Sequence, residues 1–179
     1  MSYNDWMSYD LFDIAEVKTG KSNTIDAVED GKYPLFDRSQ IIKRSNKYLF
    51  DEVAILIPGE GQEFIPRFYK GKFDLHQRVY AVLPNDNIIN PKYLYYLMHH
   101  HKDTLSKIAV GTTVKSLRLS SFEFLEFKIP SLKIQNIVQQ ILSNLDEKIE
   151  LNNKINNNLE ELAQTLYKHW FVDFEFPNE

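Results

Sequence analysis

Residues 134–170 read IQNIVQQILSNLDEKIELNNKINNNLEELAQTLYKHW, and this stretch decides how the chain is organised. Its apolar residues recur every three or four positions once Asn152 is counted with them, which predicts one amphipathic helix about 54 Å long. A globular domain of ~130 preceding residues has a radius of gyration of only about 14 Å. We therefore expect most of this apolar stripe to pack on a partner helix. The expected interface residues are Ile134, Val138, Ile141, Leu145, Ile149, Asn152, Ile155, Leu159, Leu162, Leu166 and Trp170.

Asn152 is the one polar residue in the stripe, and two interpretations of it stay open. Together with Asn156 nearby, it can hydrogen-bond to its counterpart in a helix pair and fix the register at some cost in stability. Alternatively, these asparagines face solvent. The stripe itself can pack on a second copy of the chain, on a different protein, or on both in turn.

Composition limits the class of protein. The 179 residues are 43% hydrophobic, enough for one domain with a real core plus an extension. The chain has no cysteine, so it has neither disulfides nor thiolate metal sites. The N-terminal region lacks an apolar signal run, and the longest aliphatic run, Val53–Ile57, is far too short to span a membrane. We expect a soluble, cytoplasmic protein without a membrane partner. Its net charge of -4 belongs to the predicted helix, because residues 1–131 carry equal numbers of acidic and basic side chains.

The first 130 residues alternate between strand and helix signals. Residues 51–59 predict a buried strand that ends in a loop, and residues 67–73 and 78–83 predict antiparallel strands. Asn90 and Pro91 begin a helix that we expect to run through Leu105. Residues 122–129 alternate as a strand does and stop at Pro130, before which a helix is disfavoured. We therefore predict an α+β architecture with a globular domain at 1–130 and a helical segment with a short tail at 131–179, where Ser131 can cap the helix.

Several segments resemble the DNA specificity subunits of type I restriction-modification systems. The helical part carries the most specific signature, which comprises residues 129–135 (IPSLKIQ), 141–160 (ILSNLDEKIELNNKINNNLE) and 170–176 (WFVDFEF). The upstream segments resemble the family's target recognition domain and occur in the family's order: residues 11–20 (LFDIAEVKTG), 33–36 (YPLF), 50–61 (FDEVAILIPGEG) and 111–115 (GTTVK). The resemblance covers nearly the whole chain.

This resemblance implies a non-catalytic DNA-reading role. The usual subunit has two recognition domains and two antiparallel helices, whereas this chain has one of each and so resembles a half subunit, natural or excised. We expect it to homodimerise through an antiparallel coiled coil. Two identical heads would read a bipartite palindrome, separated by at most roughly 16 base pairs for a helix of this length. The implied partners are double-stranded DNA, a modification methyltransferase subunit and a restriction translocase or nuclease subunit.

Three loops carry polar residues suited to DNA. Thr112 and Thr113 follow Gly111 in a turn of small residues that allows close approach to a phosphate. The full candidate set is Arg38, Ser39, Gln40, Lys43, Arg44, Gln62, Thr112, Thr113, Lys115 and Ser116, with Glu60, Gly61 and Lys47 beside them. Each of these residues can equally be a solvated loop residue. Balanced charge in residues 1–131 argues against strong non-specific binding without the partner enzyme.

Catalytic and metal-binding motifs are weak. His99, His100 and His101 are consecutive, so on a helix they point about 100° apart and cannot converge on one metal ion. Glu16 and Lys18, with Asp13 before them, resemble the carboxylate and lysine core of metal-dependent nucleases, and this gives the alternative hypothesis of a small nuclease. We predict a protein that is not an enzyme and that needs no metal or cofactor.

Overall fold

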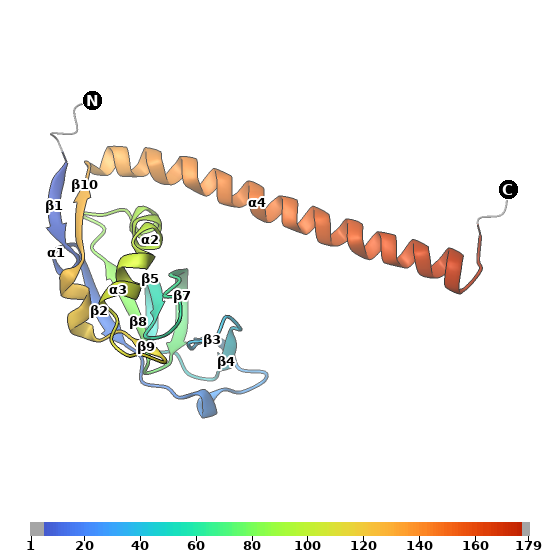
Figure 1. The fold of residues 1–179 in the computed structure, drawn as a ribbon, viewed down its shortest axis with the longest axis horizontal. Coiled ribbons are helices and arrows are strands. Elements are labelled where there is room, and N and C mark those ends of the chain that lie inside the picture. The colour runs from blue at the N-terminus through green and yellow to red at the C-terminus, as the bar shows by residue number, and fades with distance from the viewer. Residues whose placement is uncertain (1–5, 177–179) are drawn as a thin grey trace. The chain divides into compact units, whose positions relative to one another are not determined.

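The computed structural model describes residues 6–176, and the chain divides into two compact units, residues 1–139 and 140–179 (Figure 1). The first unit contains the strands and the short helices. Its strands are β1 (Met7–Asp10), β2 (Ala15–Thr19), β3 (Tyr33–Phe36), β4 (Lys43–Ser45), β5 (Phe50–Pro58), β6 (Glu60–Gly61), β7 (Arg67–Leu75), β8 (Val79–Pro84), β9 (Lys115–Ser116) and β10 (Glu126–Ile129). Its helices are α1 (Leu11–Ile14), α2 (Pro91–His100) and α3 (Lys102–Ile108), with 3-10 turns η2 (Thr24–Asp26) and η3 (Leu119–Phe124).

A six-stranded mixed sheet in the order β2-β8-β5-β7-β3-β4 forms the scaffold. The buried strand expected at 51–59 is β5, which pairs antiparallel with both β7 and β8 as the alternation predicted. β3 joins the sheet parallel to β7, and β4 continues antiparallel at the edge. Two small sheets are added, β1 with β10 and β6 with β9.

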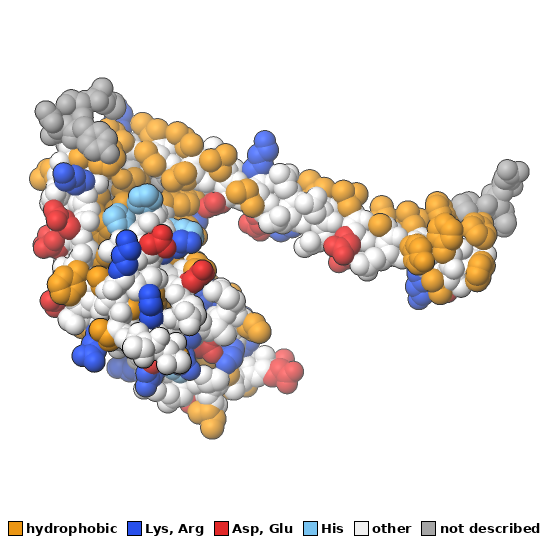
Figure 2. All heavy atoms as spheres, in the orientation of Figure 1, with side chains coloured by type: hydrophobic (Ala, Val, Ile, Leu, Met, Phe, Trp, Pro, Cys, Tyr) orange, Lys and Arg blue, Asp and Glu red, His pale blue; other side chains and the backbone are white. Residues whose placement is uncertain are grey.

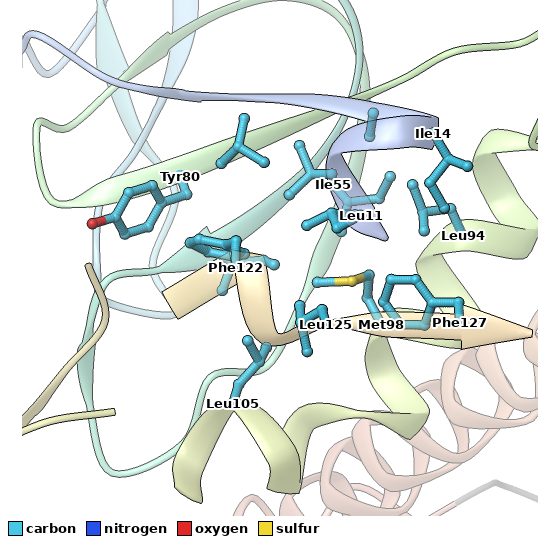
Figure 3. Close-up of a cluster of buried hydrophobic side chains, with 14 of the residues drawn as sticks. Leu11, Ile14, Ile55, Tyr80, Leu94, Met98, Leu105, Phe122, Leu125 and Phe127 are labelled. Atoms are coloured by element: carbon cyan, nitrogen blue, oxygen red, sulfur yellow. The ribbon is translucent and has the colours of Figure 1, made fainter. Parts of the chain in front are cut away.

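The core occupies both faces of this sheet because alternate residues of β5 point to opposite sides. Ile55 and Ile57 belong to the main cluster, which the short helices and η3 cover (Figure 3). Leu56 and Ala54 belong to a second cluster on the other face, where Phe50 stacks on Phe73 with ring centroids 5.0 Å apart.

Two expectations about local structure were wrong. The helix that begins at Asn90 does not continue through Leu105, because His101 leaves helical geometry at φ -91° and ψ 10° and separates α2 from α3. Met98 in α2 and Leu105 in α3 are both fully buried. Residues 122–129 are not one strand, since η3 extends to Phe124 and only β10 is extended. Phe122 and Leu125 are both buried, and a spacing of three residues fits a 3-10 turn better than strand alternation.

The expected long helix is confirmed: α4 runs without interruption over 36 residues, Leu132–Tyr167, and continues as a π-helical turn, η4 (Lys168–Val172). Its first turns belong to the globular unit, where Val138 packs against the main core cluster. Gln135 is buried there, and its amide nitrogen donates to the carbonyl oxygens of Ile88 (3.1 Å) and Pro130 (2.9 Å). The Gln135 side-chain oxygen accepts from the backbone N–H of Asn90 at 2.8 Å, so the start of α4 is tied to the start of α2.

The apolar residues of the stripe from Ile141 to Leu166 are exposed in the single chain. The exposed fractions of Ile141, Leu145, Ile149, Ile155, Leu159 and Leu162 lie between 46% and 58%, and that of Leu166 is 39%. Figure 2 shows these hydrophobic side chains recurring along α4. Pairing of this face with a second helix stays a prediction. No helix within residues 6–176 has the length and apolarity needed to cross a membrane.

Candidate nucleic-acid interface

Three loops that are distant in sequence surround one open depression on the globular unit. Its lining residues are Thr24, Asp37, Arg38, Ser39, Lys43, Glu60, Gly61 and Val114. Arg38, Ser39 and Lys43 were predicted from sequence to touch DNA, and the structure brings them next to the loops that hold Glu60 and Val114. The depression therefore collects residues from all three predicted DNA-reading loops.

Strand pairing explains why these loops meet. β3 ends beside the end of β7, with Phe36 opposite Leu75, so Asp37 and Arg38 emerge next to the turn between β7 and β8. β6 follows β5 directly and pairs with β9, which places Gly61 opposite Lys115. Thus β5 and β7 fix the positions of the loops, while the loops themselves carry the polar side chains.

Glu60 connects two arginines at this depression. Its carboxylate forms ion pairs with Arg38 and with Arg78. The Glu60 side chain is only 15% exposed, whereas the arginine side chains are 46% and 57% exposed. One partly buried carboxylate therefore orients two guanidinium groups that remain about half exposed. Arg78 was missed by sequence reasoning because it lies within a predicted strand and its partner is 18 residues away.

Asp37 organises the neighbouring loop. Its carboxylate accepts hydrogen bonds from the Ser39 backbone N–H (2.8 Å) and hydroxyl (2.7 Å), and its other oxygen pairs with Lys43 Nζ at 2.7 Å. Burial alone would raise the pKa of Asp37, but the hydrogen bonds from Lys43 and Ser39 outweigh it and lower this pKa below its ordinary value. The carboxylate therefore stays ionised, and it holds Ser39 and Lys43 in place at the rim.

Arg67 lies beneath the same loop and was not a candidate. It donates to the Asp37 carbonyl at 2.8 Å, and its guanidinium lies 5.7 Å from the centre of the Phe36 ring. Its Nε and Nη1 are buried and have no hydrogen-bond partner among the described residues. Burial lowers the pKa of Arg67. A positive charge with spare donors thus supports the loop that carries Arg38.

A buried polar cluster lies beside β3, the strand that leads to Asp37, because Asp74 on β7 pairs with Leu35. Asp74 on β7 accepts hydrogen bonds from the hydroxyls of Ser22 (2.8 and 2.9 Å) and Ser45 (2.9 Å). These serines lie in the segment after β2 and at the end of β4. Nearby, His76 Nδ1 accepts from the Arg78 backbone N–H at 3.0 Å. Burial, together with the positive charge of Arg38, lowers the pKa of His76 and keeps the ring neutral.

Three further candidates make contacts within the chain, and their contact with DNA stays a prediction. Lys115 Nζ donates to the Ser106 carbonyl at 2.8 Å, and this contact holds the β9 loop against the end of α3. Arg44 donates to the carbonyls of Gly31 (2.9 Å) and Lys32 (3.1 Å). Ser116 exchanges backbone hydrogen bonds with Val110. The remaining candidates, Gln40, Gln62, Thr112 and Thr113, are exposed, and their contact with DNA stays a prediction.

The residues of the nuclease hypothesis lie elsewhere. Glu16 and Lys18 form an ion pair of 2.8 Å on the exposed side of β2.

The consecutive histidines have different surroundings. His101 packs its ring against Phe127 with centroids 5.1 Å apart, while His100 is exposed. Within residues 6–176, no group of three or more His, Asp or Glu side chains is placed to hold a metal ion.

The chain combines an α+β domain, whose polar loops gather at one depression, with one long helix. This is the architecture of a binding domain joined to a helical spacer. The sequence profile of the type I restriction modification DNA specificity domain matches residues 3–161. The chain belongs to this family.

Individual relatives agree with this assignment. The EcoDI specificity subunit of Escherichia coli is 28% identical over 146 residues, covering 82% of this chain and 32% of that subunit. The MjaIX specificity subunit of Methanocaldococcus jannaschii is 30% identical over 141 residues, covering 77% of this chain and 32% of that subunit. The crystal structure of the type I restriction-modification S subunit from M. genitalium superposes with a TM-score of 0.79 at 21% identity, covering 95% of this chain and 46% of that one, and it shows a shared fold. The chain spans less than half the length of these relatives.

Proposed function

We propose that this chain is a non-catalytic, cytoplasmic DNA-recognition component of a type I restriction-modification system. Residues 1–130 form the reading domain, and residues 131–179 form the helix that spaces and joins reading domains. The observation that carries the proposal is the convergence of the loops of Arg38, Glu60 and Val114 on one depression. Two half-exposed arginines and short polar side chains there suit a groove edge and its phosphates.

The chain acts as a homodimeric half subunit. Two copies joined through α4 present two identical depressions, so the target is a short sequence repeated in inverted orientation around unread base pairs. Support comes from the apolar face of α4, which is exposed in one chain, and from the family, whose usual members carry two such halves. The dimer recruits the modification methyltransferase and, where present, the restriction subunit.

Methylome mapping tests this proposal. We expect a strain that expresses the chain together with a type I modification methyltransferase subunit to carry methylation at one gapped palindrome, and Arg38→Ala to abolish these marks. Lys70→Ala is the matched control, because Lys70 is an exposed cation on β7 outside the candidate set. An asymmetric bipartite motif would mean that this chain supplies only one half of the reader. Unchanged methylation in the absence of the chain would refute the recognition role.

Glu60→Gln tests the depression directly. We expect affinity for random duplex DNA to rise about tenfold at low salt, because Arg38 and Arg78 lose their carboxylate and become available to phosphates; the slope of log K against log salt should steepen by up to about two units. Discrimination between target and random DNA should fall, since neither arginine is held in place. Fluorescence anisotropy over a salt series measures both effects. Glu52→Gln, the same change near the start of β5, should leave both unchanged, and weaker random-DNA binding by Glu60→Gln would contradict the assignment.

A further inference from the structure

The apolar residues of α4 are distributed symmetrically about Asn152. Ile149 and Ile155 lie three residues before and after it, and Leu145 and Leu159 lie seven before and after. The correspondence continues outward through Ile141 with Ala163 and Ile137 with Tyr167. All of these residues lie within the uninterrupted helix Leu132–Tyr167, so their spacing along the axis is regular. Apolar residues therefore lie at equal distances before and after Asn152 along this face of the helix.

These residues also share one face. At about 100° per residue, the pairs 149 with 155, 145 with 159, 141 with 163 and 137 with 167 all lie within roughly 60° of the direction of Asn152. The large members of these pairs are exposed, from 46% for Ile155 to 63% for Tyr167. An exposed, continuous apolar surface of this kind marks a site where another protein surface packs.

Such symmetry is what a two-fold, antiparallel helix pair requires. In an isologous contact, a residue n positions before the axis meets the residue n positions after it in the other copy. A partner of unrelated sequence would place no such constraint on the spacing. We propose that α4 pairs with α4 of a second copy about a two-fold axis at Asn152, so that Leu145 of each copy meets Leu159 of the other. This inference rests on the proposed homodimer and specifies its register.

Slipped registers differ mainly in what they place opposite Asn152. A shift of the axis by two residues toward the C-terminus places Ile155 opposite Asn153 and Leu162 opposite Asp146. The same shift toward the N-terminus keeps apolar pairs such as Leu145 with Ile155, but it places Asn152 opposite Lys148. Larger shifts of half a heptad place Asn152 opposite Leu159 or Leu145, where its amide has no hydrogen-bond partner. Only the axis at Asn152 sets the single polar residue of the seam against itself, which is how a buried asparagine selects one register.

Introduced thiols test the register, because the chain contains no cysteine. Leu145→Cys and Leu159→Cys are purified separately, mixed and oxidised. We expect the mixture to form a disulfide-linked dimer at least about ten times more than either variant alone, since a disulfide needs Cα atoms within about 7 Å. In either variant alone the two thiols lie about 21 Å apart along the helix axis. Asn152→Cys should cross-link with itself, and Asn157→Cys, on the outer face, should not.

The outcomes separate this register from the homodimer itself. Preferential cross-linking of Ile149→Cys with Leu159→Cys, in protein that sediments as a dimer under reducing conditions, would overturn the axis at Asn152 and keep the homodimer. Cross-linking of Leu145→Cys and Leu159→Cys each with itself would indicate a parallel pair and overturn the proposal. Sedimentation of the wild-type chain as a monomer would overturn both the register and the homodimer, while the methylome test of DNA recognition would still stand on its own.

Discussion

Leu159→Asp is expected to convert the homodimer into monomers at micromolar concentration. Leu159 is 58% exposed in the single chain, so the change should cost the fold of one chain little. In a two-fold dimer the substitution occurs twice, and each copy removes about 1.5 kcal/mol or more of apolar burial and places a carboxylate in an apolar seam. We expect the dissociation constant to rise at least about a thousandfold, which corresponds to about 4 kcal/mol.

Sedimentation equilibrium over a concentration series measures this effect. Asn157→Asp is the matched control, because it adds the same charge to the same helix on the face turned away from the seam. Circular dichroism of both variants should match the wild type at a concentration where all are monomeric. If Leu159→Asp and the control dimerise equally well, the apolar face of α4 does not hold the two copies together.

Gly20→Ala is expected to destabilise the reading domain severely. A Cβ at position 20 would lie 2.0 Å from the Leu75 carbonyl oxygen and 2.4 Å from that of His76. These are backbone atoms at the end of β7 and the start of the turn that follows it, so no side-chain rotation can relieve the overlap. The segment after β2 must then move away, and the hydrogen bonds from Lys21 N (3.0 Å) and Ser22 N (3.1 Å) to Leu75 are lost. We expect the free energy of unfolding to fall by at least about 3 kcal/mol.

Urea denaturation followed by tryptophan fluorescence and circular dichroism measures this loss. Thr19→Ala, one residue earlier on the exposed side of β2, is the control and should cost less than about 1 kcal/mol. Because Ser22 also leaves Asp74, Gly20→Ala should expose the segment around Thr24 to protease before the rest of the domain. Equal urea midpoints for Gly20→Ala and Thr19→Ala would mean that the backbone around Gly20 and Leu75 can move apart more easily than the distances indicate.

The elements that sequence predicts well are those whose signal is local and periodic. β5 was predicted from its aliphatic run, and α4 from a stripe that continues for ten helical turns. The break at His101 was missed because Leu94, Leu97, Met98 and Leu105 keep helical spacing across it. Apolar spacing is the same with or without a break between the two helices, so it does not reveal the break.

The candidate site shows the same limit. Sequence reasoning selected loops at Arg38, Glu60 and Thr112, and strand pairing brings these loops together. It also selected Lys115 and Arg44, whose cationic groups bind backbone carbonyls of segments 9 and 13 residues away. It missed Arg67 and Arg78, because their partners Asp37 and Glu60 lie 30 and 18 residues away. The sequence shows that a loop residue is charged. Which residue it contacts depends on how the strands of the sheet pair.

The sharing of Glu60 by Arg38 and Arg78 limits how specificity can be re-engineered. If only residues 37–40 were replaced by those of a relative, Glu60 and Arg78 would face a different side chain at position 38. That side chain would then lack the ion pair that orients Arg38. A functional exchange must move the three segments around positions 38, 60 and 78 as one cassette. New target preferences should therefore arise more readily from recombining whole reading domains than from substitutions accumulated one loop at a time.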